Sequence, residues 1–533
     1  MELPQPTHKN YTTLISNIET GQIRIPQFQR DFVWTMDRSA ALLDSMVKGY
    51  PIGTFIFWRT RESLKSVKNI GEIKLPAPRK NSAVIFVLDG QQRLISLFAT
   101  LKGLTIDRDS NKKDDFSGIY VNLNADGSEE IVTTNVTDLA KKTFIPLTEL
   151  LRGDLTDLVA FPKKYHKKLD EYKRRIEAYD FPVIEVHDFS IDVATDIFTR
   201  INVSGKTLTV FEIMVAKTYE EKCGFDLSKE YEKLIDDLEQ VDYQTISNQT
   251  ILRLIAQILK NKSNRQTILN LKKDKFIEIW PKAVDSIKQA INCFQNVIGV
   301  PVSQLLPYLD LLVLFAYFFY KCSKRPTSTQ IKELKNLFWR CSLGGRYDAA
   351  IDSRLTQDIR RVDQIIEGKS PNYDWKIDIS PEHLIENGTF NPGASFIKAI
   401  LCVMASKRPW SFNKNEIVRT SNHWLSRSNG KNYHRFFSKA FLKENGIDDP
   451  YANSIINVTI AEDYLDKKKI GAKSPSEYIK ELEENNSEFT KTIKTHLIKD
   501  LEEFGILDND YDTFIQKRAE VISEEIKKWI IEK

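Results

Sequence analysis

The clearest pattern of apolar and polar positions lies at residues 84–103. An apolar, largely β-branched run at 84–88 predicts a buried strand, which ends at Asp89-Gly90. A helix with one buried face is predicted directly afterwards by apolar residues spaced i, i+3, i+4 and i+7: Leu94, Leu97, Phe98 and Leu101. Gly103 suits the C-terminal end of that helix. The segment is therefore expected to be a strand, a tight turn and a helix.

Two other stretches carry comparable patterns. Apolar residues at 42, 43, 46, 47 and 50 predict a helix, and the run 54–58 predicts the strand that follows it. Val193, Ile197 and Ile201 share one face of a further helix. Thr209 and Glu212 have the spacing of a capping box, so another helix is expected to begin there.

On a coarser scale the pattern divides the chain into three parts. Residues 1–215 mix strand and helix signals, 216–405 are mostly helical, and 406–533 hold short mixed elements and a terminal helix at 511–531. The polar stretch 107–130 is interpreted as a loop or hairpin insertion, and 368–388 as a surface loop. The predicted class is α+β, with three domains that have these boundaries.

Composition narrows the class of protein. A chain of 533 residues is expected to hold two to four domains. Its net charge of +4 is too small for the charge of the whole molecule to indicate nucleic-acid binding. Five scattered cysteines give no disulfide or zinc pattern and fit a reducing cytosol. The most apolar stretch, 308–320, includes Asp310 and is shorter than the roughly 20 residues that span a bilayer. A buried core helix and a cytoplasmic protein without a signal peptide or membrane contact are expected.

The turn at residues 89–93, Asp-Gly-Gln-Gln-Arg, brings polar groups to the start of a helix. Backbone N–H groups and the positive end of the helix dipole favour an anion there. Gly90 lets the backbone approach a ligand, and Arg93 can fork onto phosphate oxygens. An ordinary strand-to-helix turn with Asp89 as the N-cap is the alternative.

Upstream, Gln29 and Arg30 lie between aromatic residues in Ile-Pro-Gln-Phe-Gln-Arg-Asp-Phe-Val-Trp, residues 25–34. Downstream, residues 198–208 read Phe-Thr-Arg-Ile-Asn-Val-Ser-Gly-Lys-Thr-Leu. Together with Asp-Gly-Gln-Gln-Arg, these stretches resemble the N-terminal domain of GmrSD-type modification-dependent restriction enzymes and their relatives in phage defence. Three motifs in the family's order make this resemblance specific.

The resemblance implies a ParB-like mixed α/β domain that binds a nucleoside triphosphate with Mg²⁺ and hydrolyses it. Residues implied in hydrolysis are Asp89, Gln91, Gln92 and Arg93. Residues implied in nucleotide binding are Gln29, Arg30, Gly90, Arg93, Arg200, Asn202 and Lys206. We expect Gln29 and Arg30 to face the same site as residues 89–93, because polar side chains between aromatics need a buried partner or a ligand.

Residues 432–478 look like the HNH-type (ββα-metal-like) nuclease domain that commonly closes chains of this family. His434 and Asn457 match the family pattern and are the candidate catalytic residues and metal ligands of this domain. Arg435 stands where the family has its general base, and arginine cannot accept that proton. Ser438 replaces a proline, and Asp466 or Lys467 falls where the last asparagine is expected. The domain is either a pseudo-nuclease that still grips DNA or a nicking enzyme that uses His434 with a divalent metal; a packed structural histidine overlaps with the first case.

Two further stretches have open interpretations. The basic run 163–175, with Tyr165, could contact phosphates or form a solvated helix face. Arg346-Tyr347 and Asp352-Ser353-Arg354 look family-like and could equally be a salt-linked helix junction.

These patterns favour an antiviral-defence protein in which an NTP-hydrolysing domain is coupled to a DNA-binding C-terminal domain. Its expected partners are DNA, a nucleoside triphosphate, and a second copy of the chain or another defence protein. A non-catalytic DNA-binding or regulatory protein, and an effector with a target other than DNA, are the alternatives.

Overall fold

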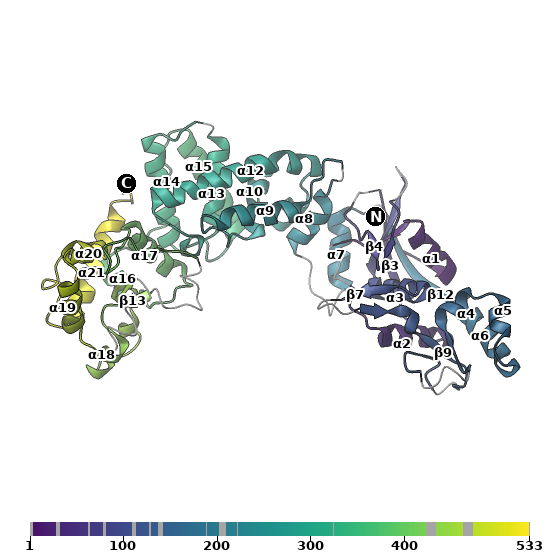
Figure 1. Cartoon of the computed structure of the whole chain (residues 1–533). Coiled ribbons are helices and arrows are strands. Elements are labelled where there is room, and N and C mark those ends of the chain that lie inside the picture. The colour runs from purple at the N-terminus through teal and green to yellow at the C-terminus, as the bar shows by residue number, and fades with distance from the viewer. Residues whose placement is uncertain are drawn as a thin grey trace. The chain divides into compact units, whose positions relative to one another are not determined.

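The chain folds into two compact units, Met1–Leu227 (unit 1) and Ser228–Lys533 (unit 2), coloured along the sequence in Figure 1. The structure is a computed structural model. It describes residues 4–531 apart from 28–31, 62–63, 78–81, 109–112, 127–128, 137–141, 188, 202–208, 221, 323, 423–432 and 462–472.

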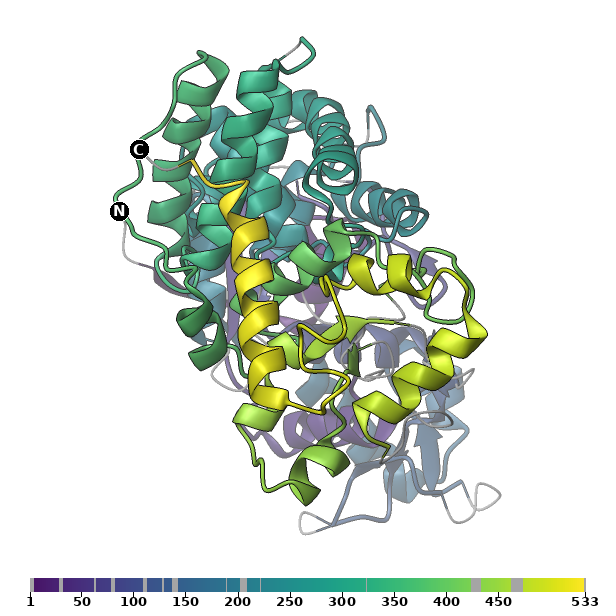
Figure 2. The same cartoon turned by 90° about the vertical axis from the view of Figure 1, so that its left-hand side faces the viewer.

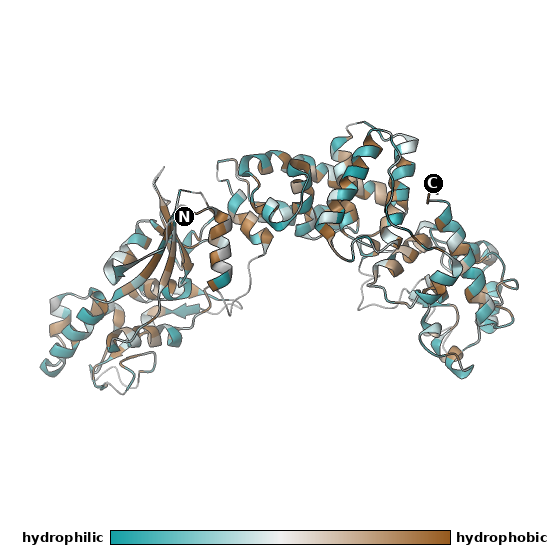
Figure 3. Ribbon diagram, turned by 180° about the vertical axis from the view of Figure 1, so that it is seen from behind, coloured by the Kyte–Doolittle hydropathy of each residue, from teal (hydrophilic) through white to brown (hydrophobic). Residues whose placement is uncertain are grey.

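Unit 1 is built on a mixed five-stranded sheet. Its strands, in spatial order, are β1 (Gln5–Asn10), β12 (Asp180–His187), β3 (Phe55–Thr60), β6 (Val84–Asp89) and β2 (Ile23–Arg24). The pairs β12–β3 and β2–β6 are parallel, whereas β1–β12 and β3–β6 are antiparallel. The end of β6 therefore lies beside the start of β3, and Ile56 pairs with Asp89 across an irregularity in the register. The strands themselves consist largely of apolar residues, which are brown in Figure 3.

Helices alternate with these strands along unit 1. They are α1 (Tyr11–Glu19), α2 (Met36–Lys48), α3 (Gln91–Lys102), α4 (Leu147–Arg152), α5 (Leu155–Val159), α6 (His166–Glu177), α7 (Ile191–Ile201) and α8 (Val210–Thr218). The helices predicted from the apolar residues at 42–50 and 94–101 are α2 and α3. The predicted capping box of Thr209 and Glu212 is present at the start of α8. Leu94, Leu97 and Phe98 are fully or almost fully buried in the core that the sheet and helices share.

Short strands flank the main sheet. They are β4 (Asn69–Ile70), β5 (Ile73–Lys74), β7 (Thr105–Asp107), β8 (Lys113–Asp115), β9 (Tyr120–Asn122), β10 (Val132–Thr133) and β11 (Phe144–Pro146). The stretch 107–130 is thus a hairpin, β7–β8, followed by part of a small sheet in the order β10-β9-β11. Phe116 and Val121 in this stretch are buried, so it is part of the core rather than only a polar loop.

Unit 2 begins as a helical array. Its first helices are α9 (Leu227–Glu239), α10 (Asn248–Lys260), α11 (Arg265–Leu269), α12 (Lys273–Cys293), α13 (Asp310–Lys321), α14 (Ser328–Leu343), α15 (Ile351–Ile366), α16 (Pro381–Glu386) and α17 (Ser395–Ser406). The apolar stretch 308–320 forms α13, whose residues 310–318 are all buried, as predicted. The segment 368–388 is not only a loop, because it contains α16.

After α17, the described part of unit 2 contains a two-stranded antiparallel sheet and further helices. These elements are β13 (Tyr433–Arg435), α18 (Lys439–Glu444), β14 (Val458–Ile460), α19 (Pro475–Asn485), α20 (Phe489–Thr495) and α21 (Tyr511–Lys527). The predicted terminal helix is α21, the long yellow helix of Figure 2, and it packs against α16 and α17. These contacts place the proposed boundary near residue 405 inside one compact unit, so a separate domain at 406–533 stays a prediction.

The mixed α/β N-terminal part and the mainly helical remainder confirm the predicted class. The ParB-like and HNH-like details of the two ends stay predictions. No helix in the described part of the chain has both the length and the apolar character needed to cross a bilayer.

Candidate functional site

Gly90 turns the chain from β6 into α3. Its φ of +94° is left-handed, and it is the N-cap of the helix. A Cβ on Gly90 would lie 2.4 Å from Cδ1 of Phe55, so the position requires glycine. The alternative with Asp89 as the N-cap is therefore wrong, because Asp89 is the last residue of β6.

The guanidinium of Arg93 fastens the start of α3 to the loop before β3. Its Nη1 donates to the carbonyl of Ile52 at 2.8 Å, and its Nη2 donates to that of Thr54 at 2.9 Å. Nη2 also lies 3.3 Å from Oδ2 of Asp89. The guanidinium carbon sits 4.9 Å from the centre of the Phe55 ring. These contacts hold the cation at the N-terminus of α3.

The surroundings of Arg93 are tight. A Cβ on Gly53, whose φ is +89°, would come within 2.6 Å of Nη1. Burial lowers the pKa of Arg93, and the Asp89 carboxylate partly offsets this effect. The guanidinium still stays charged near neutral pH. With side chains 14% and 35% exposed, Arg93 and Asp89 present a fixed cation and a carboxylate at the N-terminus of α3.

Gln92 joins this turn to the aromatic segment 25–34. Both Gln91 and Gln92 are buried, and Oε1 of Gln92 accepts a hydrogen bond from the backbone N–H of Val33 at 2.9 Å. Two of the three predicted motifs therefore meet in unit 1. Gln29 and Arg30 themselves lie outside the described residues, so their predicted position stays a prediction.

Arg108 is a residue of this site that the sequence pattern did not reveal. It follows β7, and its Nη1 donates to the carbonyl of Phe32 while Nη2 donates to that of Trp34 at 2.5 Å. Its Nε donates to Oδ2 of Asp114 at 2.9 Å. No local spacing links Arg108 to a segment more than 70 residues earlier, and its polar surroundings indicate only a loop or hairpin.

The third motif is described only in part. Arg200 lies in the last turn of α7, where it is exposed. This helix packs against β6, the strand that ends at Asp89. Asn202 and Lys206 lie outside the described residues, so their predicted roles in nucleotide binding stay predictions.

In unit 2, His434 faces the protein interior. It is 3% exposed, and its ring lies edge-on to the rings of Phe436 and Tyr478 at 6.4 and 6.5 Å. Its partner across the two-stranded sheet is Thr459, whose Oγ1 is hydrogen bonded to Nδ1 of His496 at 2.8 Å. A base or metal ligand needs access to water or to a ligand, and this side chain lies in a packed aromatic environment.

His496 is also buried in this interior. Its Nε2 lies 2.8 Å from the carbonyl of Trp410, and its ring stacks on Phe412 with centres 4.2 Å apart. Burial, with a smaller contribution from the nearby charge of Arg518, lowers the pKa of His496 to about 3. Because the Trp410 carbonyl can only accept, Nε2 carries the proton and Nδ1 accepts from Thr459.

Asn457 shapes the turn after β13. Its Oδ1 accepts from the backbone N–H of Phe437 and its Nδ2 donates to the carbonyl of the same residue, both at 2.9 Å. The fully buried guanidinium of Arg518 donates to the carbonyls of Ile456 and Val458, on either side of Asn457. Burial lowers the pKa of Arg518 to about 9. Asn457 therefore has a structural role in this turn.

Arg435 points to the other face of β13, as alternation along a strand requires. Its Nη2 donates to Oδ1 of Asn453 at 2.9 Å, and the guanidinium lies 5.6 Å from the Phe390 ring centre. Ser438 is the N-cap of α18. Asp466 and Lys467 lie outside the described residues. Among the described residues, no group of three or more His, Cys, Asp and Glu side chains is placed to hold a metal ion, and a divalent metal here stays a prediction.

The basic run 163–175 lies on a 3-10 turn and α6, and its last two arginines are paired within unit 1. Arg174 and Arg175 form i,i+4 ion pairs with Asp170 and Glu171. Tyr165 is buried and donates to Oδ1 of Asn124 at 2.6 Å, so its ring does not offer a stacking surface. A solvated helix face accounts for these contacts, and phosphate binding by the run stays a prediction.

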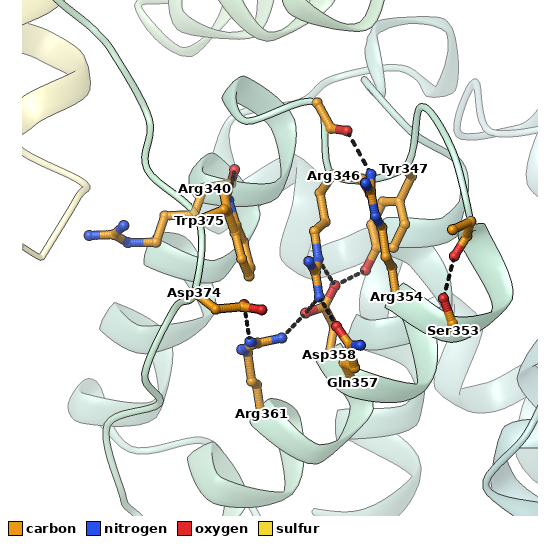
Figure 4. Close-up of polar contacts among 12 residues, drawn as sticks. Arg340, Arg346, Tyr347, Ser353, Arg354, Gln357, Asp358, Arg361, Asp374 and Trp375 are labelled. Carbon is orange, nitrogen blue, oxygen red and sulfur yellow. Dashed lines mark hydrogen bonds and ion pairs between the residues drawn. The ribbon is translucent and has the colours of Figure 1, made fainter.

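The family-like residues at 346–354 form a salt-linked helix junction. Figure 4 shows Arg346, Tyr347 and Arg361 converging on the carboxylate of Asp358, at 2.6 to 3.2 Å. Asp358 is completely buried. The guanidinium groups of Arg346 and Arg361 both lie close to the ring of Trp375, at 4.2 and 4.9 Å from its centre. The cluster ties α14, α15 and the following segment together.

Comparison with known proteins agrees with the predicted resemblance. Residues 11–219 match the family described as GmrSD restriction endonuclease, N-terminal domain. The whole chain is also similar to MJ0686, an uncharacterised protein of Methanocaldococcus jannaschii, with 24% identity over 609 residues. That alignment covers 99% of this chain and 100% of the relative. The family match spans all three motifs and ends at residue 219, close to the end of unit 1.

Proposed function

Residues 11–219 form a GmrSD-type N-terminal domain, and on this premise we propose that the chain is a restriction-like protein of phage defence. Unit 1 binds and hydrolyses a nucleoside triphosphate, and unit 2 engages DNA. The observation that carries the proposal is the turn at 89–93, where Gly90, Asp89 and Arg93 are built around the N-terminus of α3 and Gln92 holds the second family motif.

The chemistry of this turn suits a triphosphate. Backbone N–H groups at a helix N-terminus and a neighbouring guanidinium both favour phosphate oxygens. Mg²⁺ bound to a triphosphate needs only one or two protein carboxylates, and the partly exposed Asp89 fits that requirement. The ion would offset charge on the phosphates, while Arg93 keeps the turn in place through Ile52 and Thr54.

The test is calorimetry with each of the four nucleoside triphosphates and Mg²⁺, followed by phosphate-release assays with and without DNA. Arg93→Ala removes a charge-assisted contact and its anchoring bonds, and we expect affinity to fall roughly ten- to hundred-fold. Arg174→Ala, an exposed arginine of the same unit, is the matched control and should bind like the wild type. Absence of binding of any nucleoside triphosphate to the wild type would end the proposal.

For unit 2 we propose a DNA-binding pseudo-nuclease. The buried His434 and the guanidinium of Arg435 at the family's base position support a domain that holds DNA without cutting it efficiently. A general base supplies about 10²- to 10⁴-fold in rate, so at most weak nicking is expected from the wild type. Arg435→His should raise nicking, whereas His434→Ala should not. Strong metal-dependent cleavage that His434→Ala abolishes would make the chain an active nicking endonuclease instead.

A non-catalytic regulatory protein is the second candidate, favoured by the same packed environment of His434. In that case unit 1 binds nucleotide without turnover. Binding in the calorimeter together with no phosphate release, with or without DNA, would identify it.

A further inference from the structure

Three exposed lysines gather where α6 begins. Lys163 and Lys164 lie on the 3-10 turn before the helix, and Lys167 lies in the first turn of α6. All three side chains are exposed, and within the described part of the chain none of them has an ion-pair partner. Residues three and four apart are neighbours on a helix surface, so these ammonium groups repel one another. Lys163, Lys164 and Lys167 are called the lysine cluster below.

The other end of the same helix treats its cations differently. Arg174 and Arg175 each form an ion pair with a carboxylate four residues earlier, Asp170 and Glu171. The first turn of α6 contains no acidic residue, although acidic side chains are favoured at that end of a helix. A helix face that only needed to be solvated could have paired its cations at both ends. The lysine cluster instead leaves its positive charge for an anion outside the chain.

Buried contacts hold the lysine cluster on a firm base. Tyr165, between the lysines, is 5% exposed and donates to Oδ1 of Asn124 at 2.6 Å. Nζ of Lys168 donates to the carbonyls on either side of Asn124, at 2.9 and 2.8 Å. Tyr165 and Lys168 therefore fasten the turn to the rest of unit 1, while the three lysines on the same turn remain exposed.

We propose that the lysine cluster is a contact for the phosphate backbone of duplex DNA on unit 1. The domain matches a family described as a restriction endonuclease, so DNA is the polyanion with which the cluster's charge is paired. A duplex is favoured over a single strand, because binding of single strands relies on aromatic rings for stacking and the Tyr165 ring is buried. The inference goes beyond the proposed function, which assigns DNA to unit 2 alone.

A contact of this kind has a defined signature. Lysines that neutralise phosphates release counterions, so the binding constant depends steeply on salt. They position the protein on the duplex without reading its sequence. The lysine cluster should therefore contribute to the affinity for any duplex, and to its salt dependence, but not to the choice of sequence or modification.

The test is fluorescence anisotropy of a labelled duplex with the full chain over a series of salt concentrations. The triple variant Lys163→Gln, Lys164→Gln and Lys167→Gln removes the cluster. We expect the slope of log K against log salt to become less negative by about two to three, because each lost phosphate contact changes it by roughly 0.9. Affinity at about 0.1 M salt should fall roughly tenfold or more.

A matched control removes three other exposed cations of unit 1. Arg59, Lys74 and Arg61 are exposed and have no ion-pair partner among the described residues, so their triple change to glutamine alters net charge equally. This control should retain the wild-type slope. Equal losses in the two triple variants would mean that only net charge matters and would overturn the inference, as would a cluster variant that binds DNA like the wild type.

The nucleotide site is tested separately. In calorimetry with Mg²⁺ and a nucleoside triphosphate, the cluster variant should bind like the wild type, and circular dichroism checks that it is folded. A wild type that binds DNA through the cluster but binds no nucleotide would refute the proposed nucleotide site and leave this inference standing. A wild type that binds no duplex would refute the inference.

Lysine footprinting places the contact directly. An amine-reactive ester modifies exposed lysines, and mass spectrometry compares the modification with and without saturating duplex. The three lysines of the cluster should be protected by the duplex, whereas Lys74 should react as before. Unchanged reactivity of the cluster would place the DNA elsewhere. Vesicles that contain an anionic phospholipid are the second polyanion, and protection by vesicles but not by the duplex would assign the cluster to a membrane surface and overturn the inference.

Discussion

At the scale of single residues, burial determines which charges the protein can carry. His496 is 2% exposed, with both ring nitrogens hydrogen bonded, and its pKa is lowered to about 3. Arg518, also buried, has only backbone carbonyls as its described acceptors. Burial therefore favours the neutral imidazole of His496, and backbone carbonyls compensate the buried charge of Arg518.

This arrangement predicts a pH dependence of stability. An unfolded histidine titrates near pH 6.5, whereas folded His496 resists protonation down to about pH 3. Between these values the unfolded state binds the additional proton, so the free energy of unfolding falls as pH falls, by about 1.4 kcal/mol per unit. The contribution is fully present above pH 6.5.

Urea unfolding at neutral pH and at about pH 5.5 measures this slope. His496→Gln should lower stability at both pH values, because it removes the stacked ring. It should also make the unfolding free energy less dependent on pH, because the variant lacks the one proton that unfolded His496 takes up. Equal slopes for the variant and the wild type would mean that His496 does not titrate as its burial requires.

At the scale of elements, local patterns were sufficient where neighbours in sequence decide the structure. The spacing of Leu94, Leu97 and Phe98 predicted α3, and Thr209 with Glu212 predicted the start of α8. The cap at Gly90 was not foreseen, because the close contact with Phe55 that requires glycine comes from another strand.

The partners within the candidate site could not be predicted in the same way. Arg93 binds carbonyls about 40 residues away, and Arg108 binds carbonyls more than 70 residues away. Backbone carbonyls are present at every residue, so no side-chain pattern marks them as acceptors. The motif resemblance located residues 89–93, but their contacts needed the fold.

The segment after α21 gives a prediction at this scale. The ring of Trp529 stacks on buried Trp339 with centres 4.6 Å apart, and the backbone of Ile531 bonds to Asn336 and Arg340 of α14. Trp529→Ala removes this contact, and we expect unit 2 to lose about 1–3 kcal/mol of stability. Lys528→Ala, at an exposed neighbour, should change stability little; equal urea midpoints for both variants would show that the stack contributes nothing.

At the scale of the whole molecule, two compact units with separate cores should behave as two folding units. We expect two transitions in differential scanning calorimetry. Asp358→Asn assigns one of them, because it leaves the buried Arg346 and the half-buried Arg361 without their shared carboxylate, a loss of about 3–5 kcal/mol. Only the transition of unit 2 should move to lower temperature in this variant.

The same measurement then places the nucleotide on one unit. A ligand that binds only folded unit 1 stabilises it by about 2.7 kcal/mol at a hundredfold excess over Kd. For a unit of 227 residues this corresponds to a rise of roughly 5–11 °C in midpoint. In wild type and Asp358→Asn alike, Mg²⁺ with the triphosphate should raise the transition that the substitution leaves unmoved. A rise confined to the other transition would move the nucleotide site out of the domain that carries Asp89 and Arg93, and equal rises in both would mean that the ligand stabilises both units and that unit 1 does not hold the site alone.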